Sequence, residues 1–263
     1  MDIITAMKER RSVRSYNGEP LSAELKSGLE KAIKDSYSLF GGNVTIRLKS
    51  FDLKGDFKPN TYGVIKGASD FFLLGIGDDE ESAFTAGFRF EQVVLKAWEM
   101  GLGTCWIAAT FKGSLFDRGE DWPKGESLKI ISPVGIPEKQ RFTEKLMRLT
   151  VGSDKRKPFS ELFFKDGFKK PLNQDDKFGE SLEMLRLAPS STNSQPWRAL
   201  VKGDKVMFYY KPKSPISILD SGIGICHFYE TEKFKGFDGR FDKETEARAA
   251  PEDWKYLISY IRI

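Results

Sequence analysis

The chain has 263 residues, of which 40% are hydrophobic and 13% aromatic, enough to build a sizeable core in one large domain or two closely packed ones. Its 42 Lys and Arg residues nearly balance 38 Asp and Glu residues and are spread along the sequence, which argues against a nucleic-acid groove. The N-terminus has no apolar signal segment, and no run approaches the ~18 apolar residues of a spanning helix, so we expect a cytoplasmic protein that does not bind membranes.

Hydrophobic periodicity predicts the secondary structure of the first half. Leu25 and Leu29 recur at helical spacing after Ser22, a good N-cap, and the continuous apolar run 71–76 is typical of a buried strand. The expected elements, in chain order, are helices 2–10 and 23–35, strands 44–53 and 71–76, helix 83–100 and strand 128–136. We expect irregular structure at 111–127.

A polar stretch at 138–175 separates this series from a second one. Its basic runs, such as the one that begins at Lys155, favour a solvated connector with one short helix near 159–165 over a binding patch. The second series then has the same order of elements as the first. It comprises helix 175–187, strands 198–202 and 205–210, helix 220–234 and strand 254–261.

The two series form a weak internal repeat. An offset of 135 residues carries Gly87 to Gly222, Gln92 to His227 and Gly101 to Gly236, so the start, face and end of one long helix match those of another. We therefore predict two related halves, residues 1–150 and 151–263.

The single histidine restricts the chemistry. His227 lies in an apolar run with no nucleophile elbow nearby, which favours a packing role, and Cys105 and Cys226 lie in apolar stretches typical of buried core. No cluster of Cys, His and carboxylate residues has zinc-site spacing. We expect no metal site and no catalytic side chain, so redox chemistry would need a cofactor.

Residues 10–16 form the first candidate binding segment. Side chains alternate along an extended chain, so Arg10, Ser12 and Arg14 can point the same way, with two guanidinium groups beside a hydroxyl. This arrangement suits a phosphate. The alternative is an exposed basic helix end.

A second candidate segment is 188–197, Ala-Pro-Ser-Ser-Thr-Asn-Ser-Gln-Pro-Trp. Its small side chains allow the backbone to approach a flat ligand, and Ser190, Ser191 and Asn193 offer donors and acceptors to a polar ring edge. The alternative is an ordinary turn between a helix and a strand.

Together these segments resemble motifs of the nitroreductase family. Arg-Arg-Ser-Val-Arg-Ser-Tyr, residues 10–16, resembles the family's opening motif, and 188–197 is similar to its second. Gly101-Leu-Gly-Thr-Cys-Trp106 and Val134-Gly-Ile-Pro137 resemble later landmarks, so the likeness touches most of the chain. It implies an α+β fold with mostly antiparallel sheets and with FMN between two subunits.

In the family, the two motifs of one site come from different subunits, whereas here they come from different halves of one chain. The first half has Ser36-Tyr-Ser-Leu-Phe-Gly-Gly-Asn43 where the Pro-Ser motif belongs, and the second half lacks Arg-Arg-Ser. The chain thus resembles nitroreductases whose monomer imitates the family dimer. The resemblance implies a pseudo-dimer with one composite site and an inactive second one; further homo-oligomers stay possible.

The resemblance further implies an FMN-dependent NAD(P)H oxidoreductase. FMN would accept a hydride from NADPH or NADH and reduce a small nitroaromatic or quinone acceptor in a ping-pong cycle. The implied FMN ligands are Arg10, Arg11, Ser12, Arg14, Pro189, Ser190, Ser191 and Asn193, with Lys145 or Arg148 at the phosphate and backbone donors at Ile107, Ala108 and Ala109. A flavin-binding module without turnover and a cofactor-free scaffold are the alternatives.

Overall fold

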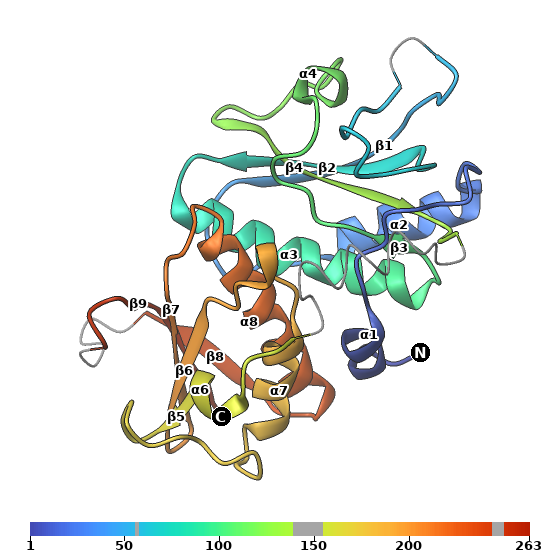
Figure 1. The fold of residues 1–263 in the computed structure, drawn as a ribbon. Helices are drawn as coiled ribbons and strands as arrows, with labels where there is room; N and C mark the ends of the chain where they lie inside the picture. The colour runs from blue at the N-terminus through green and yellow to red at the C-terminus, as the bar shows by residue number, and fades with distance from the viewer. Residues whose placement is uncertain (56–57, 139–154, 244–249) are drawn as a thin grey trace.

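The first half of the molecule contains one sheet with helices on one face (Figure 1). The computed structural model describes residues 1–55, 58–138, 155–243 and 250–263. The sheet has the order β1-β2-β4-β3, all pairs antiparallel, with β1 (Val44–Ser50), β2 (Asp70–Gly77), β4 (Glu126–Gly135) and β3 (Gly103–Thr104). Helices α2 (Ala23–Asp35) and α3 (Glu80–Glu99) pack on it, and short α4 (Gly113–Phe116) lies beyond the other face.

The second half contains a sheet of the order β5-β6-β7-β9-β8. Its strands are β5 (Phe163–Lys165), β6 (Trp197–Lys202), β7 (Lys205–Tyr210), β9 (Lys255–Arg262) and β8 (Gly239–Asp242). Only the β5–β6 pair among these is parallel. The helical elements are α6 (Phe159–Leu162), α7 (Gly179–Leu187), the 3₁₀ turn η1 (Ser191–Asn193) and α8 (Ser217–Phe234).

The strand orders show the internal repeat directly. β6-β7-β9-β8 in the second sheet repeats β1-β2-β4-β3 in the first, and each series has its long helix after the second strand. One hydrophobic core includes buried residues of both sheets and of α3 and α8. The predicted α+β fold with duplicated halves is therefore confirmed, whereas the boundary at residue 150 lies outside the described residues.

The offset of 135 residues holds for individual hydrogen bonds at the ends of the long helices. After α3, the Gly101 N–H donates to Trp98 O (2.9 Å); after α8, the Gly236 N–H donates to Lys233 O (2.9 Å). Both glycines have φ +79°, the left-handed conformation that glycine adopts without a steric penalty. Each helix therefore ends in the same way, as the sequence repeat predicts.

Two further glycines let α3 and α8 cross in close contact. A Cβ atom on Gly87 would lie 2.1 Å from Leu219 O, and one on Gly222 would lie 2.1 Å from Phe84 O. These two contacts are related by the same offset of 135 residues, so the crossing is pseudo-symmetric. It brings the backbones of the halves together between the two sheets (Figure 1).

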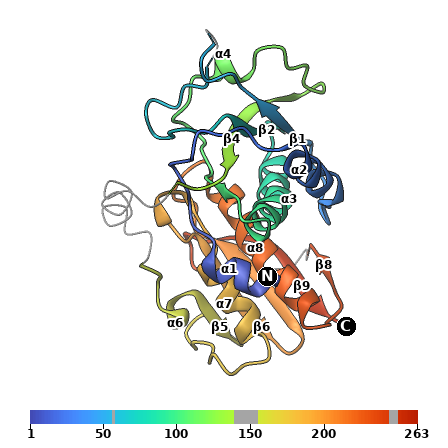
Figure 2. The same cartoon turned by 90° about the vertical axis from the view of Figure 1, so that its right-hand side faces the viewer.

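The first helix joins the halves at a second place. α1 (Ile3–Glu9) lies beside α7 rather than on the sheet of its own half (Figures 1 and 2), and Ile4 and Met7 share a buried cluster with Met184. The N-cap Asp2 accepts from the Thr5 N–H (2.8 Å). This packing places the chain that follows α1, residues 10–16, between the two halves.

The polar connector differs from its prediction. Lys169 and Lys170 are exposed, as a solvated segment requires, but Phe159, Leu162 and Phe163 are buried. They enter the core because β5 pairs with β6. A strand of three residues is too short for its sequence pattern to predict this parallel pairing. The short elements β3, α4 and β8 were also absent from the predicted series.

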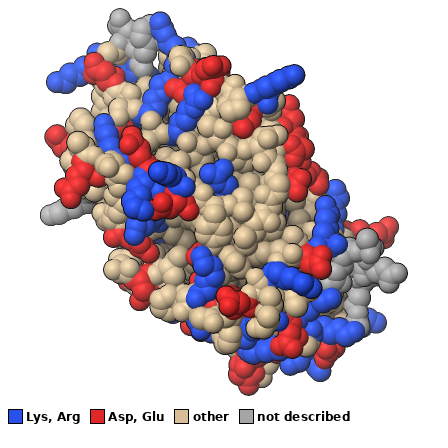
Figure 3. Space-filling model, turned by 180° about the vertical axis from the view of Figure 1, so that it is seen from behind, with Lys and Arg blue, Asp and Glu red and all other residues tan. Residues whose placement is uncertain are grey.

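Charged side chains are mixed on the surface. On the face drawn in Figure 3, basic and acidic residues are interspersed around a largely uncharged area in which basic atoms are also visible. Among the described residues, no helix is long and apolar enough to cross a membrane.

Candidate functional site

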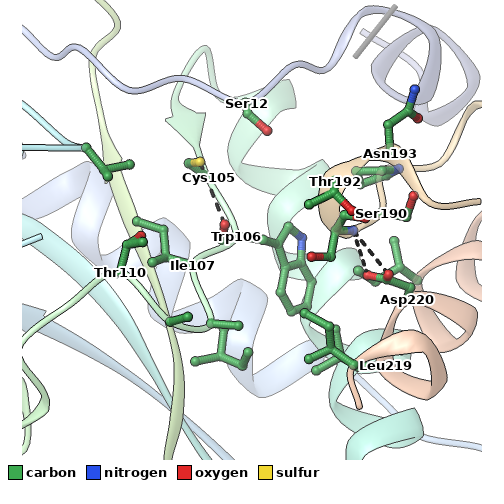
Figure 4. Close-up of a pocket in the computed structure, with 18 of the residues that line it drawn as sticks. Ser12, Cys105, Trp106, Ile107, Thr110, Ser190, Thr192, Asn193, Leu219 and Asp220 are labelled. Carbon is green, nitrogen blue, oxygen red and sulfur yellow. Dashed lines mark hydrogen bonds between the residues drawn. The ribbon is translucent and has the colours of Figure 1, made fainter. Parts of the chain in front are cut away.

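A cavity of about 450 Å³ lies between the halves, and both candidate segments line it. In Figure 4, Ser12, Cys105 and Ile107 lie on one side and Ser190, Asn193 and Asp220 on the other. The predicted ligands that line the cavity are Arg10, Arg11, Ser12, Arg14, Ile107, Ala108, Ala109, Pro189, Ser190, Ser191 and Asn193. Lys145 and Arg148 lie outside the described residues, so their proposed phosphate contacts stay predictions.

The first segment is extended as predicted. Ser12 forms a parallel bridge with Thr104 of β3, and the Val13 N–H donates to Thr104 O (2.8 Å). Val13 and Ser15 are buried in the protein while Ser12 and Arg14 alternate with them and line the cavity. Backbone pairing therefore fixes which side chains face the cavity.

Arg10 has an unusual environment for a cation. Its side chain is 5% exposed, and its Nε lies 3.7 Å from Oε1 of buried Glu91. Its buried Nη1 has no hydrogen-bond partner among the described residues. A buried guanidinium N–H without an acceptor is costly, and an anion in the cavity would relieve that cost.

The second segment holds a strained turn. Thr192, Asn193 and Gln195 have φ values of 50°, 55° and 47°, a conformation that is unfavourable for residues other than glycine. The Ser191 N–H donates to the Asp220 carboxylate (3.1 Å), and the Gln195 N–H donates to Ser190 Oγ (3.0 Å). These hydrogen bonds hold the turn against the start of α8.

Asn193 uses its amide group within the protein. Its Oδ1 accepts from Arg156 Nη1 (2.7 Å), and its Nδ2 donates to Lys155 O (2.7 Å). The amide thus fixes the end of the connector to the turn. Its predicted contact with a ring edge stays a prediction, and it would require exchange of one of these bonds.

The segment after β3 supplies fewer backbone donors than predicted. The Ile107 N–H donates to Ile131 O (3.0 Å), so it is not available to a ligand. The N–H groups of Ala108 and Ala109 have no such partner in the described part of the chain, and both residues line the cavity. Two of the three proposed donors therefore stay candidates.

Trp106, Arg156 and Asp220 are three of the lining residues that were not among the predicted site residues. Trp106, whose indole lies in the middle of the view in Figure 4, donates from Nε1 to Glu91 Oε2 (2.9 Å). Arg156 comes from the connector, where the basic run predicted only a solvent-exposed surface. Asp220 comes from α8. Asp220 had a signal in the sequence, because it is an acid at the start of an apolar helix.

The pseudo-symmetric counterpart of the cavity is filled. Phe84 and Phe88 correspond to the lining residues Leu219 and Ile223 at the offset of 135 residues. The ring of Phe40 packs on both, with centroids 4.8 and 5.1 Å away. Because Phe40 belongs to the segment that replaces the Pro-Ser motif, we expect one ligand site per chain.

We expect Asp220→Asn to stabilise the protein at neutral pH more than at acid pH. Burial raises the pKa of the Asp220 carboxyl from 3.8 to about 7, despite the hydrogen bond from Ser191. Between about pH 4 and pH 7 the folded state binds more protons than the unfolded state, so the stability contribution of Asp220 is lost as pH rises through this range.

Urea unfolding at several pH values measures this effect. The variant should gain up to about 4 kcal/mol over the wild type between pH 4 and pH 8, whereas Asp121→Asn, at an exposed aspartate, should follow the wild type. Parallel curves for wild type and Asp220→Asn would contradict the raised pKa.

Comparison with known proteins identifies similar structures. The chain is similar to a "putative nitroreductase" from Thermotoga maritima, with 20% identity, 99% of this chain and 94% of that chain covered, and a TM-score of 0.61. A "putative nitroreductase in complex with FMN" from Desulfovibrio desulfuricans has 19% identity, with 56% of this chain and 96% of that one covered and a TM-score of 0.42. A nitroreductase with bound FMN from Bacteroides fragilis has 17% identity, coverages of 54% and 94%, and a TM-score of 0.41.

A search of curated proteins found no match. The Thermotoga structure shares the fold over nearly the whole chain. A family model described as "Putative TM nitroreductase" matches residues 2–231. Because that match spans well over half of the sequence, the chain belongs to this nitroreductase family.

Proposed function

We propose that the protein is an FMN-dependent NAD(P)H oxidoreductase that reduces nitroaromatic, quinone or similar flat acceptors at one composite site. One observation carries this proposal: the Arg-Ser-Arg segment of the first half and the Pro-Ser turn of the second half line the same cavity. A chain that keeps both segments on one cavity has the two parts that the family takes from separate subunits. One chain would then contain a complete ligand site, with NADPH or NADH as reductant.

The cavity fits FMN in size and in chemistry. Its volume of about 450 Å³ is in the usual range for small-molecule sites. Basic side chains line one part of it, including Arg10, whose buried Nη1 has no partner among the residues that the structure describes. Apolar side chains such as Leu219 and Ile223 line another part. A phosphate suits the first part and an aromatic ring system suits the second.

The protein's own groups then have defined tasks. Arg10, Ser12 and Arg14 bind the phosphate, and the N–H groups of Ala108 and Ala109 donate to the ring. The apolar wall excludes water. When bound, FMN supplies the hydride and electron chemistry, so no side chain has to act as an acid or base, and the only histidine lies outside the cavity wall.

The visible spectrum of the purified protein tests the proposal. We expect flavin absorbance, release of FMN on denaturation, and oxidation of NADPH or NADH when a nitroaromatic or quinone is added. Flavin without turnover would favour a binding module. A colourless protein that does not bind added FMN would leave only a cofactor-free scaffold.

A further inference from the structure

A buried pair of titratable side chains lies just behind the cavity wall. Glu91 of α3 and His227 of α8 are both 0% exposed, and Glu91 Oε1 lies 3.0 Å from His227 Nε2. The other ring nitrogen, Nδ1, lies 3.1 Å from Met184 O of α7. Neither side chain lines the cavity, so the ligand site described above leaves this pair without a role.

The hydrogen bonds of the pair require one more proton than a neutral imidazole and an ionised carboxylate carry together. A carbonyl oxygen only accepts, so the hydrogen bond to Met184 O requires a proton on Nδ1. A neutral imidazole has a single N–H, which would leave Nε2 as an acceptor. An ionised carboxylate also only accepts, so the 3.0 Å contact would then join two acceptors. An additional proton must lie on His227 Nε2 or on Glu91.

The surroundings of Glu91 favour the ionised carboxylate. Trp106 Nε1 donates to its Oε2 (2.9 Å), and Arg10 Nε lies 3.7 Å from its Oε1. Both contacts stabilise a negative charge, and the buried carboxylate has His227 as its nearest ionisable partner. On the histidine side, the Met184 carbonyl at Nδ1 is neutral, and the Thr231 hydroxyl donates to the backbone carbonyl of His227. The proton therefore belongs on the imidazole.

We propose that His227 is a buried imidazolium paired with the Glu91 carboxylate, and that the pair positions Arg10 and Trp106 on the cavity wall. Arg10 and Trp106 line the cavity and both contact Glu91. Two cations around one carboxylate leave a net positive charge there, which suits an anionic group. The protonation state stands on the hydrogen bonds and on the Arg10 contact, whereas the anion's identity as the FMN phosphate rests on the proposed function.

Because His227 and Arg10 share Glu91, Arg10 keeps an N–H group that can donate to a ligand. An ionised Glu91 without the imidazolium would attract the guanidinium more strongly and turn it away from the cavity. With His227 protonated, Glu91 is already paired, and Arg10 stays at 3.7 Å with Nη1 without a partner in the described part of the chain. His227 and Glu91 are thus positioning residues, which act through Arg10.

Nitrogen-15 NMR of the flavin-free protein tests the protonation state, and the single histidine makes the signals unambiguous. We expect both ring nitrogens of His227 to be protonated at neutral pH. In Glu91→Gln the amide can donate to a neutral Nε2, so only Nδ1 should keep its proton. An unprotonated Nε2 in the wild type would overturn the proposal.

Titration with FMN tests the positioning role separately. His227→Gln, which places at 227 the residue found at the pseudo-equivalent Gln92, should bind FMN about tenfold more weakly while it keeps its circular dichroism spectrum. Glu99→Gln removes a carboxylate from the same helix at its surface pair with Lys96 and should bind like the wild type. Unchanged affinity in His227→Gln would overturn the positioning role. Failure of the wild type to bind FMN, with a doubly protonated His227, would instead contradict the proposed function.

Discussion

Arg14→Glu is expected to yield a folded protein that retains no FMN. Arg14 lines the cavity beside Ser12, on the segment that β3 fixes by backbone pairing. Reversal of its charge replaces the proposed phosphate ligand with a carboxylate, so attraction to the phosphate would become repulsion. We expect FMN affinity to fall by at least about a hundredfold, a larger effect than simple truncation would produce.

Flavin stoichiometry after gel filtration measures this loss. Lys8→Glu is the matched control, because it makes the same change of charge at an exposed position of α1 near the same segment. That variant should keep its flavin. An Arg14→Glu protein with unchanged stoichiometry would show that the phosphate lies elsewhere.

Gly87→Ala should strongly destabilise the fold. The added Cβ would lie 2.1 Å from Leu219 O, an atom of the α8 backbone that cannot move aside without moving the helix. We expect the free energy of unfolding to fall by about 3 kcal/mol or more, as for severe overpacking in a core. Because Leu219 and Asp220 line the cavity, FMN affinity should fall as well.

Urea unfolding followed by tryptophan fluorescence gives the size of this effect. Gly113→Ala is the control, since its Cβ would meet only Phe111 Cε2, at 3.9 Å. It should change the free energy of unfolding by less than about 1 kcal/mol. An equal loss of unfolding free energy in the two variants would show that the close crossing of α3 and α8 does not determine the stability of the fold.

Much of the architecture could be predicted because local sequence features, such as helix caps, determine the repeated elements. Gly101 and Gly236 end helices by the same left-handed cap, and helix 23–35 was predicted with its observed bounds because Ser22 caps it. β3, β5 and β8 depend instead on partners far away in the sequence. Strands of two to four residues have too few side chains to show a period.

The site was predicted in part for a similar reason. Alternation along residues 10–16 requires only an extended chain, so the sequence indicated the side that faces the cavity. Arg156 and Trp106 become lining residues through tertiary contacts with Asn193 and Glu91, which no spacing rule reveals. The expectation that the Ile107 N–H is available to a ligand is wrong, because its pairing with Ile131 depends on how the chain folds back.

Because α3 and α8 belong to one chain, the two sides of their crossing can change in sequence independently of each other. In a symmetric homodimer, every substitution appears on both sides of the two-fold axis, so a change that improves one ligand site also alters the other. Here Gly87 and Gly222 are encoded separately, and so are Phe84 and Leu219. Each side can therefore mutate alone. One side can lose its pocket to an aromatic ring while the other diverges toward a new ligand.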